Sequence, residues 1–194
     1  MAMPIPVPEP TVWTVEMLRD LPDDGKRYEI IDGELLVSPS PRLRHQRAIG
    51  VLFTILGTYL RPTGAGFVYF APADVEFSRT RVVEPDLFVV PLVDGRPPNH
   101  FHEVRRLLLA IEVLSPSTAL YDRQKKRRLY QSERVPEYWI VDCDARLIER
   151  WRPDDERPEI LTESLAWHPE GAGAPLVIDV AALFEEIGDD SPSP

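Results

Sequence analysis

The sequence predicts an α/β fold with a mixed central β-sheet flanked by helices. Residues 43–60 repeat apolar side chains at helical spacing, whereas residues 107–114 form a nearly continuous apolar run typical of a strand buried on both faces. Short strand-like segments alternate with helical segments elsewhere, as expected for a sheet covered by helices. The chain has 194 residues, of which 43% are hydrophobic, and this is enough for one domain with a packed core.

The N-terminal elements that we expect are a short helix and a β-hairpin. Residues 11–20 favour a helix that begins after Thr14 or Thr11. Residues 28–37 form two apolar halves around Asp32-Gly33, a dipeptide that strongly favours a two-residue hairpin turn.

The longest expected element is the amphipathic helix at 43–60. We expect it to end before Pro62, because proline lacks the backbone N–H that continues a helix. The other elements expected are strands at 67–70, 73–77, 82–90, 107–114, 138–141 and 147–151, a helix at 117–131 and a last helical turn at 180–186.

We expect a single domain over residues 13–186, between a flexible proline-rich arm at 1–12 and a disordered acidic tail at 187–194. The N-terminus has neither the basic nor the apolar region of a signal peptide, and no apolar run approaches the ~20 residues that span a bilayer. Cys143 is the only cysteine, which excludes a disulfide framework and a cysteine-based zinc site. We therefore expect a cytoplasmic protein without membrane association.

Two acidic residues interrupt apolar, strand-like sequence. Glu112 lies within LLLAIEVL, and Asp86 lies within VVEPDLFVV, directly after Pro85. Each could be a solvent-facing acid, Glu112 at a strand end and Asp86 on an edge strand. Alternatively, an antiparallel return would place Asp86 beside Glu112, and a divalent cation would relieve the repulsion between the two carboxylates. Oxygen ligands alone favour Mg²⁺ or Mn²⁺ over zinc.

A basic helical segment follows the strand that carries Glu112. Asp122, Lys126 and Tyr130 lie four residues apart and therefore share one helix face. Lys126 could form an ordinary surface pair with Asp122, or it could reach the carboxylates and stabilise charge on a phosphate. The neighbouring basic residues form either a solvated helix face or contacts with nucleic-acid phosphates; they are Lys125, Arg127 and Arg128.

Several blocks of this sequence resemble the Uma-two family of bacterial proteins, which has a restriction-endonuclease-like core and belongs to the PD-(D/E)XK nuclease superfamily. The resemblance covers roughly residues 13–186, and its Asp-Gly-Glu-Leu and Val-Pro-Glu-Tyr-Trp blocks are the most specific. The matching blocks are residues 28–35 (YEIIDGEL), 84–86 (EPD), 111–117 (IEVLSPS) and 135–142 (VPEYWIVD), with His45, Asp122–Lys126 and Tyr130.

The resemblance implies a metal site that holds Mg²⁺ or Mn²⁺. Asp86 takes the place of the aspartate in the superfamily motif and Glu112 that of the second acid, and the backbone carbonyl of Val113 is a further ligand. It also implies DNA as the substrate and, by analogy with nucleases that pair, a homodimer.

This sequence departs from the superfamily motif at Leu114, which stands where a lysine is expected. The resemblance assigns the role of that lysine to Lys126 on the following helix, with Lys125 as the alternative. It also marks Glu34 as an extra acidic ligand or water-positioning group and His45 as a phosphate contact or proton-transfer group. Without such roles, Glu34 would merely flank the hairpin turn and His45 would be a surface residue in the first turn of the long helix.

These observations favour a metal-dependent endonuclease that hydrolyses DNA phosphodiester bonds. The alternative is a catalytically inactive protein of the same fold that binds nucleic acid or a protein partner, as Leu114 and the net charge of −10 would favour. That net charge excludes a surface that is basic throughout but allows one local basic groove. A hydrolase that uses serine and His45 ranks last, because no Gly-x-Ser-x-Gly motif is present.

Overall fold

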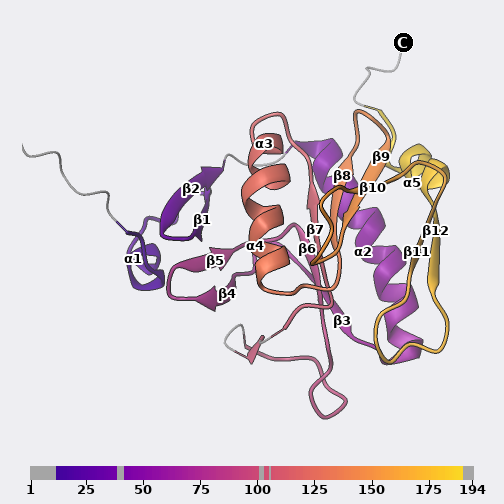
Figure 1. The fold of residues 1–194 in the computed structure, drawn as a ribbon, viewed down its shortest axis with the longest axis horizontal. Coiled ribbons are helices and arrows are strands. Elements are labelled where there is room, and N and C mark those ends of the chain that lie inside the picture. The colour runs from indigo at the N-terminus through magenta and orange to yellow at the C-terminus, as the bar shows by residue number, and fades with distance from the viewer. Residues whose placement is uncertain (1–11, 39–41, 101–102, 105, 190–194) are drawn as a thin grey trace, which may run out of the picture.

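The computed structural model describes residues 12–38, 42–100, 103–104 and 106–189, and a six-stranded mixed sheet lies at its centre (Figure 1). The strand order is β10-β9-β8-β7-β6-β3. Its strands are β3 (Phe67–Phe70), β6 (Leu87–Val90), β7 (Leu109–Val113), β8 (Tyr138–Asp142), β9 (Leu147–Trp151) and β10 (Glu159–Leu161). The fold class expected from the sequence is confirmed.

The only parallel pair in this described sheet is β7–β8, and the other neighbours are antiparallel. A parallel pair needs a crossover connection, which here is helical. The crossover consists of α3 (Ala119–Tyr121), a π-helical segment (Asp122–Lys126) and α4 (Arg127–Ser132).

Helices cover both faces of the central sheet. Figure 1 shows the α3–α4 crossover on one side and α2 (Leu43–Thr63) on the other. Alternate residues of β7 separate accordingly, because successive side chains of a strand point to opposite faces. Leu109, Ile111 and Val113 pack in the cluster that contains α2, whereas Ala110 packs with Leu129 and Tyr130 of α4. Glu112 continues the Ala110 side and therefore faces the crossover.

The expectation that α2 ends before Pro62 is wrong. The helix continues through Pro62 to Thr63 and ends at Gly64, whose φ of 63° is left-handed. The backbone N–H of Gly64 donates to the carbonyl of Leu60 at 3.0 Å. Glycine adopts this conformation without a Cβ clash, so the left-handed cap ends the helix, and proline costs one backbone hydrogen bond in the last turn.

A second, four-stranded antiparallel sheet adjoins the first, in the order β2-β1-β5-β4. Its strands are β1 (Arg27–Ile31), β2 (Glu34–Ser38), β4 (Val75–Ser78) and β5 (Arg81–Val83). The predicted hairpin is confirmed, since Asp32 and Gly33 have φ values of 51° and 81° at the tip between β1 and β2. Helix α1 (Val15–Arg19) begins after Thr14.

The single strand expected at 82–90 is two strands in different sheets. β5 ends at Val83 and β6 begins at Leu87, so residues 84–86 cross from the four-stranded to the six-stranded sheet. Pro85 cannot donate a ladder hydrogen bond, which is consistent with a break at this point. Asp86 therefore lies at the entry to β6 rather than inside a strand.

The C-terminal residues form a hairpin and a helix that sequence periodicity did not predict in full. They are β11 (Ser164–Trp167), β12 (Leu176–Asp179) and α5 (Val180–Ile187), and they pack with α2 in one core cluster. Ile187 is buried, so the expected tail cannot begin at residue 187. Residues 190–194 and residues 1–11 of the expected arm lie outside the described residues. No helix in the described ranges is long and apolar enough to cross a membrane.

Gly66, before β3, lies in close contact with the backbone of the central sheet. A Cβ at this position would lie 2.7 Å from the carbonyl oxygen of Val90, which is backbone and cannot rotate away. Gly66→Ala should therefore lower the free energy of unfolding by about 1–3 kcal/mol in urea titrations. Gly50→Ala in α2 is the control, because a Cβ there meets nothing within 4 Å. It should raise stability by about 0.5–1 kcal/mol, and equal effects of the two changes would contradict the packing described.

Candidate active site

The two predicted carboxylates lie side by side, Glu112 on β7 and Asp86 at the entry to the adjacent strand β6. Leu87 of β6 is opposite Ile111 of β7 in an antiparallel register, so the next pair along is Asp86 and Glu112. Both side chains are almost fully buried, at 1% and 2% exposure. The interpretation of either acid as solvent-facing is therefore wrong, and the predicted juxtaposition is confirmed.

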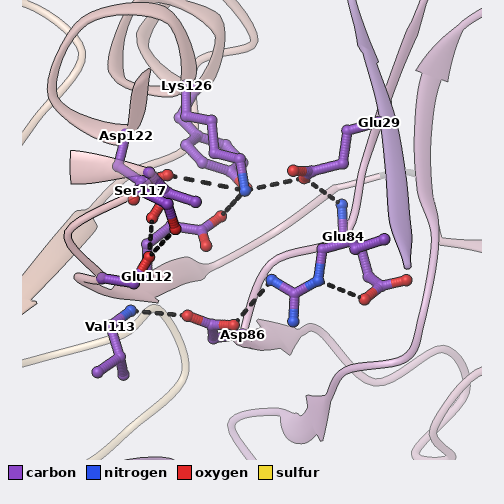
Figure 2. Close-up of polar contacts among 12 residues, drawn as sticks. Glu29, Glu84, Asp86, Glu112, Val113, Ser117, Asp122 and Lys126 are labelled. Atoms are coloured by element: carbon purple, nitrogen blue, oxygen red, sulfur yellow. Dashed lines mark hydrogen bonds and ion pairs between the residues drawn. The ribbon is translucent and has the colours of Figure 1, made fainter. Parts of the chain in front are cut away.

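Asp86 is held by three donors (Figure 2 shows two of them). Its Oδ2 accepts from the backbone N–H of Val113 at 2.8 Å and lies 3.0 Å from Nε2 of His45. Its Oδ1 accepts from NH1 of Arg27 at 2.9 Å. Burial alone would raise the pKa of Asp86, but the hydrogen bond and charge of His45 and the charges of Arg27 and Lys126 outweigh it and lower the pKa to about 2.

Lys126 is a buried ammonium shared by carboxylates of three elements (Figure 2). Its Nζ lies 2.8 Å from Glu112 of β7, 2.8 Å from Glu29 of β1 and 3.9 Å from Asp122 of the π-helical segment. Tyr130 donates its hydroxyl to the same oxygen of Glu112 at 3.2 Å. The prediction that Asp122, Lys126 and Tyr130 share one helix face is confirmed, and Lys126 reaches Glu112. Segments of π-helix are frequent at functional sites.

The pKa values of Lys126, Glu112 and Asp122 are all shifted from their usual values. Desolvation alone would lower the pKa of Lys126, but the neighbouring carboxylates of Glu112, Glu29 and Asp122 reverse this and raise it. The pKa of Glu112 is raised well above its usual value by burial and by repulsion from nearby acids, despite the attraction of Lys126. Burial likewise raises the pKa of Asp122 to about 6.

Two residues of β1 complete the site, and the sequence analysis missed both. Arg27 bridges Glu84 and Asp86, with its Nε 2.6 Å from Oε1 of Glu84. Glu29 accepts from the backbone N–H of Glu84 at 2.8 Å and from Lys126. Its other oxygen, Oε2, is buried without a partner among the described residues. The signal that identified Glu112, a lone acid in apolar strand sequence, is also present at Glu29 within YEII.

Both predicted carboxylates, Asp86 and Glu112, line a cavity of about 210 Å³. Its lining includes the start of α2 and the loop that leads from β7 into the crossover. Its lining residues are Arg27, Ser38, Arg42, His45, Asp86, Glu112, Val113, Ser115, Pro116, Ser117, Thr118, Asp122 and Lys126.

Four predicted residues do not line this cavity. Glu34 forms an exposed ion pair with Lys125, so the alternative lysine is engaged elsewhere and only Lys126 reaches the carboxylates. Arg127 lies over the ring of Trp151 at 4.7 Å and donates to Gln131 at 2.7 Å. The fourth residue is Arg128, which is exposed on α4.

The cavity fits a divalent cation that keeps part of its hydration shell. The acidic groups in the network outnumber its two permanent cations, Arg27 and Lys126; they are Glu29, Glu84, Asp86, Glu112 and Asp122. No three histidine, cysteine, aspartate or glutamate side chains in the described ranges are arranged to hold a metal. Asp86, Glu112 and a backbone carbonyl are oxygen groups that could hold a hydrated Mg²⁺ here, since proteins bind this ion through few carboxylates and several waters.

A mixed α/β fold whose adjacent strands bring two buried carboxylates to a lysine defines a restriction-endonuclease-like protein. The chain belongs to the Uma2 family, described as "Putative restriction endonuclease", whose sequence model matches residues 15–179. The structure is similar to the crystal structure of "a putative nuclease belonging to DUF820" from Anabaena variabilis, with a TM-score of 0.75 and 21% identity over 90% of this chain and 98% of that chain. Comparison with curated proteins gives no significant match.

The difference between Lys126 and Lys125 is testable by unfolding. Lys126→Met leaves Glu29 and Glu112 buried without their ammonium partner, and it should destabilise the protein by about 3–5 kcal/mol at pH 7. Lys125→Met removes only the exposed pair with Glu34 and should cost about 0–1 kcal/mol. Urea titrations of the two variants measure the difference, and similar losses would contradict the burial described for Lys126.

The low pKa of Asp86 predicts a specific acid dependence of stability. Because the folded-state pKa, at about 2, lies below the ordinary aspartate value of 3.8, Asp86 stabilises the fold above about pH 4, and this contribution is lost as the pH falls toward 2. The shift corresponds to about 2 kcal/mol. Stability curves of the wild type and Asp86→Asn should therefore converge by about this amount between pH 5 and pH 2. A constant difference over this range would contradict the assignment.

Proposed function

We propose that the protein is a metal-dependent endonuclease that hydrolyses DNA phosphodiester bonds. The observation that carries the proposal is the convergence of Asp86, Glu112 and Lys126, from two strands and the crossover helix, in one open cavity. Membership of a family described as restriction endonucleases supports a nucleic-acid substrate.

In this proposal Asp86, Glu112 and the carbonyl of Val113 hold Mg²⁺ or Mn²⁺. Such an ion polarises a phosphoryl oxygen and lowers the pKa of water to the range where it becomes a nucleophile at neutral pH. Val113 and His45 fix the orientation of Asp86 through hydrogen bonds to its Oδ2. A preorganised carboxylate needs little rearrangement when its ligand arrives.

Lys126 supplies the positive charge that the phosphate needs as negative charge builds up in the transition state. Its ammonium is kept protonated by Glu29, Glu112 and Asp122, so it donates protons in hydrogen bonds rather than accepting one. Tyr130 holds Oε1 of Glu112 from the crossover helix. Arg128 and Lys125, exposed or partly exposed on that helix, are the proposed contacts with flanking phosphates.

A homodimer is part of the proposal by analogy with nucleases of the superfamily, and it is measured by sedimentation of the purified protein. The alternative function is nucleic-acid binding without hydrolysis. It is favoured by the three donors that hold Asp86 and by Leu114 at the lysine position of the superfamily motif.

The proposal predicts nicking or cleavage of plasmid DNA in the presence of Mg²⁺ or Mn²⁺ and its loss with EDTA. Asp86→Asn, Glu112→Gln and Lys126→Gln should each lower the rate by about 100-fold or more, because each removes a metal ligand or the charge beside the phosphate. Gel electrophoresis of the plasmid forms measures the rate.

Glu133→Gln is the matched control for Glu112→Gln. Glu133 also pairs with a cation, Arg81, at 2.6 Å, but it lies away from the cavity. This variant should cleave as the wild type does. Cleavage that survives Asp86→Asn and Glu112→Gln, or DNA binding without cleavage under every metal condition, would contradict the proposed function.

A further inference from the structure

Arg27, the first residue of β1, contacts both carboxylates of the Glu-Pro-Asp segment, Glu84 and Asp86. Its Nε lies 2.6 Å from Oε1 of Glu84, and its NH1 donates to Oδ1 of Asp86 at 2.9 Å. The Arg27 side chain is 18% exposed and lines the same cavity as Asp86 and Glu112. A permanent cation therefore covers one of the two carboxylates to which the proposed function assigns a metal ion.

The two oxygens of Asp86 differ in the donors that hold them. Oδ2 is held by His45 and by the backbone N–H of Val113, which is fixed within β7. Within the described ranges, the hydrogen bond to Oδ1 comes from Arg27. A carboxylate oxygen has two lone pairs, so Oδ1 keeps one position for a further ligand. A divalent cation at that position would meet the guanidinium at close range and repel it.

Glu84 allows the guanidinium to leave Asp86 without leaving the cavity. The Nε–Glu84 contact uses a different nitrogen from the NH1–Asp86 contact. The backbone of Glu84 is anchored, because its N–H donates to the buried Glu29 at 2.8 Å. Rotation of the guanidinium about this anchored Nε contact would release NH1 while the side chain stays at the cavity.

We propose that Arg27 is a substrate-binding residue, which contacts Asp86 in this structure and turns toward a phosphodiester oxygen when a divalent cation binds. This inference rests on the proposed function and adds the residue that receives the phosphate. The planar guanidinium suits phosphate oxygens, and its charge does not depend on pH in the physiological range. The cation and the substrate are then coupled through one side chain.

The inference predicts opposite effects of one substitution on two affinities. Arg27→Gln should lower the dissociation constant for Mn²⁺ by about tenfold, because the competing charge is gone. It should raise the dissociation constant for a short DNA duplex by about tenfold in Ca²⁺, which binds oxygen ligands as Mg²⁺ does. Calorimetry with Mn²⁺ alone and fluorescence anisotropy with the duplex measure the two constants. A residue that only supported the fold would weaken both affinities.

Two control variants separate charge from packing. Arg27→Lys keeps the positive charge, so its Mn²⁺ affinity should stay within about threefold of the wild type. Arg81 is a matched arginine that also bridges two acids, Asp32 and Glu133, at 2.6 Å each, but it does not line the cavity. Arg81→Gln should leave Mn²⁺ binding unchanged.

A crystal of the wild type soaked in Mn²⁺ tests the movement without any substitution. The inference requires NH1 of Arg27 to lie beyond hydrogen-bond distance of Asp86 while its Nε stays on Glu84. Mn²⁺ on Asp86 with the Arg27 contact intact, or Mn²⁺ affinity that is unchanged or weaker in Arg27→Gln, would overturn the inference and leave the proposed function standing. Absence of Mn²⁺ binding in both the wild type and Arg27→Gln would overturn the proposed metal site and the inference with it.

Discussion

The ion pairs of the buried Lys126 ammonium hold together the parts of the fold that form the cavity. Carboxylates from β1, β7 and the crossover helix meet at this one charge, at 2.8, 2.8 and 3.9 Å. Because these elements belong to two different sheets and to the helix between β7 and β8, the ammonium joins the parts of the fold that build the cavity. Removing water from ions costs several kcal/mol per ion, so such a contact persists only where its partners are all in place.

Hydrophobic side chains in place of this ion cluster would stabilise the fold equally well or better. Buried ion pairs are often neutral in free energy relative to well-packed hydrophobic side chains. Burial raises the pKa values of Glu112 and Asp122, and repulsion from neighbouring acids adds to this effect despite the attraction of Lys126. Strongly perturbed ionisable groups in an open cavity are characteristic of functional sites. The arrangement is therefore better explained by chemistry at the site than by folding.

In the proposed function, the charge of the site couples metal binding to nucleic-acid binding. The protein carries a net charge of −10, and the cavity itself is rich in carboxylates. A phosphodiester would be repelled by this cavity unless positive charge first compensates the acids. A divalent cation between Asp86 and Glu112 provides that compensation, so metal binding and nucleic-acid binding are thermodynamically linked in the proposed function.

Local patterns in the sequence were enough to predict the main helices and strands and the pairing of the two carboxylates. Apolar periodicity located α2 and β7, Asp32-Gly33 located the hairpin, and the antiparallel return placed Asp86 beside Glu112. These features depend on residue spacing and turn chemistry, which are properties of short segments.

The ion pairs of the site depend on the tertiary packing of distant segments. This packing separated Lys126, which is buried among acids, from its neighbour Lys125, which is paired with Glu34 at the surface. It also brought Arg27 and Glu29 from a strand more than 50 residues away onto the Glu-Pro-Asp segment. Contacts between distant segments depend on how two sheets pack against each other, and no local pattern in the chain encodes that packing.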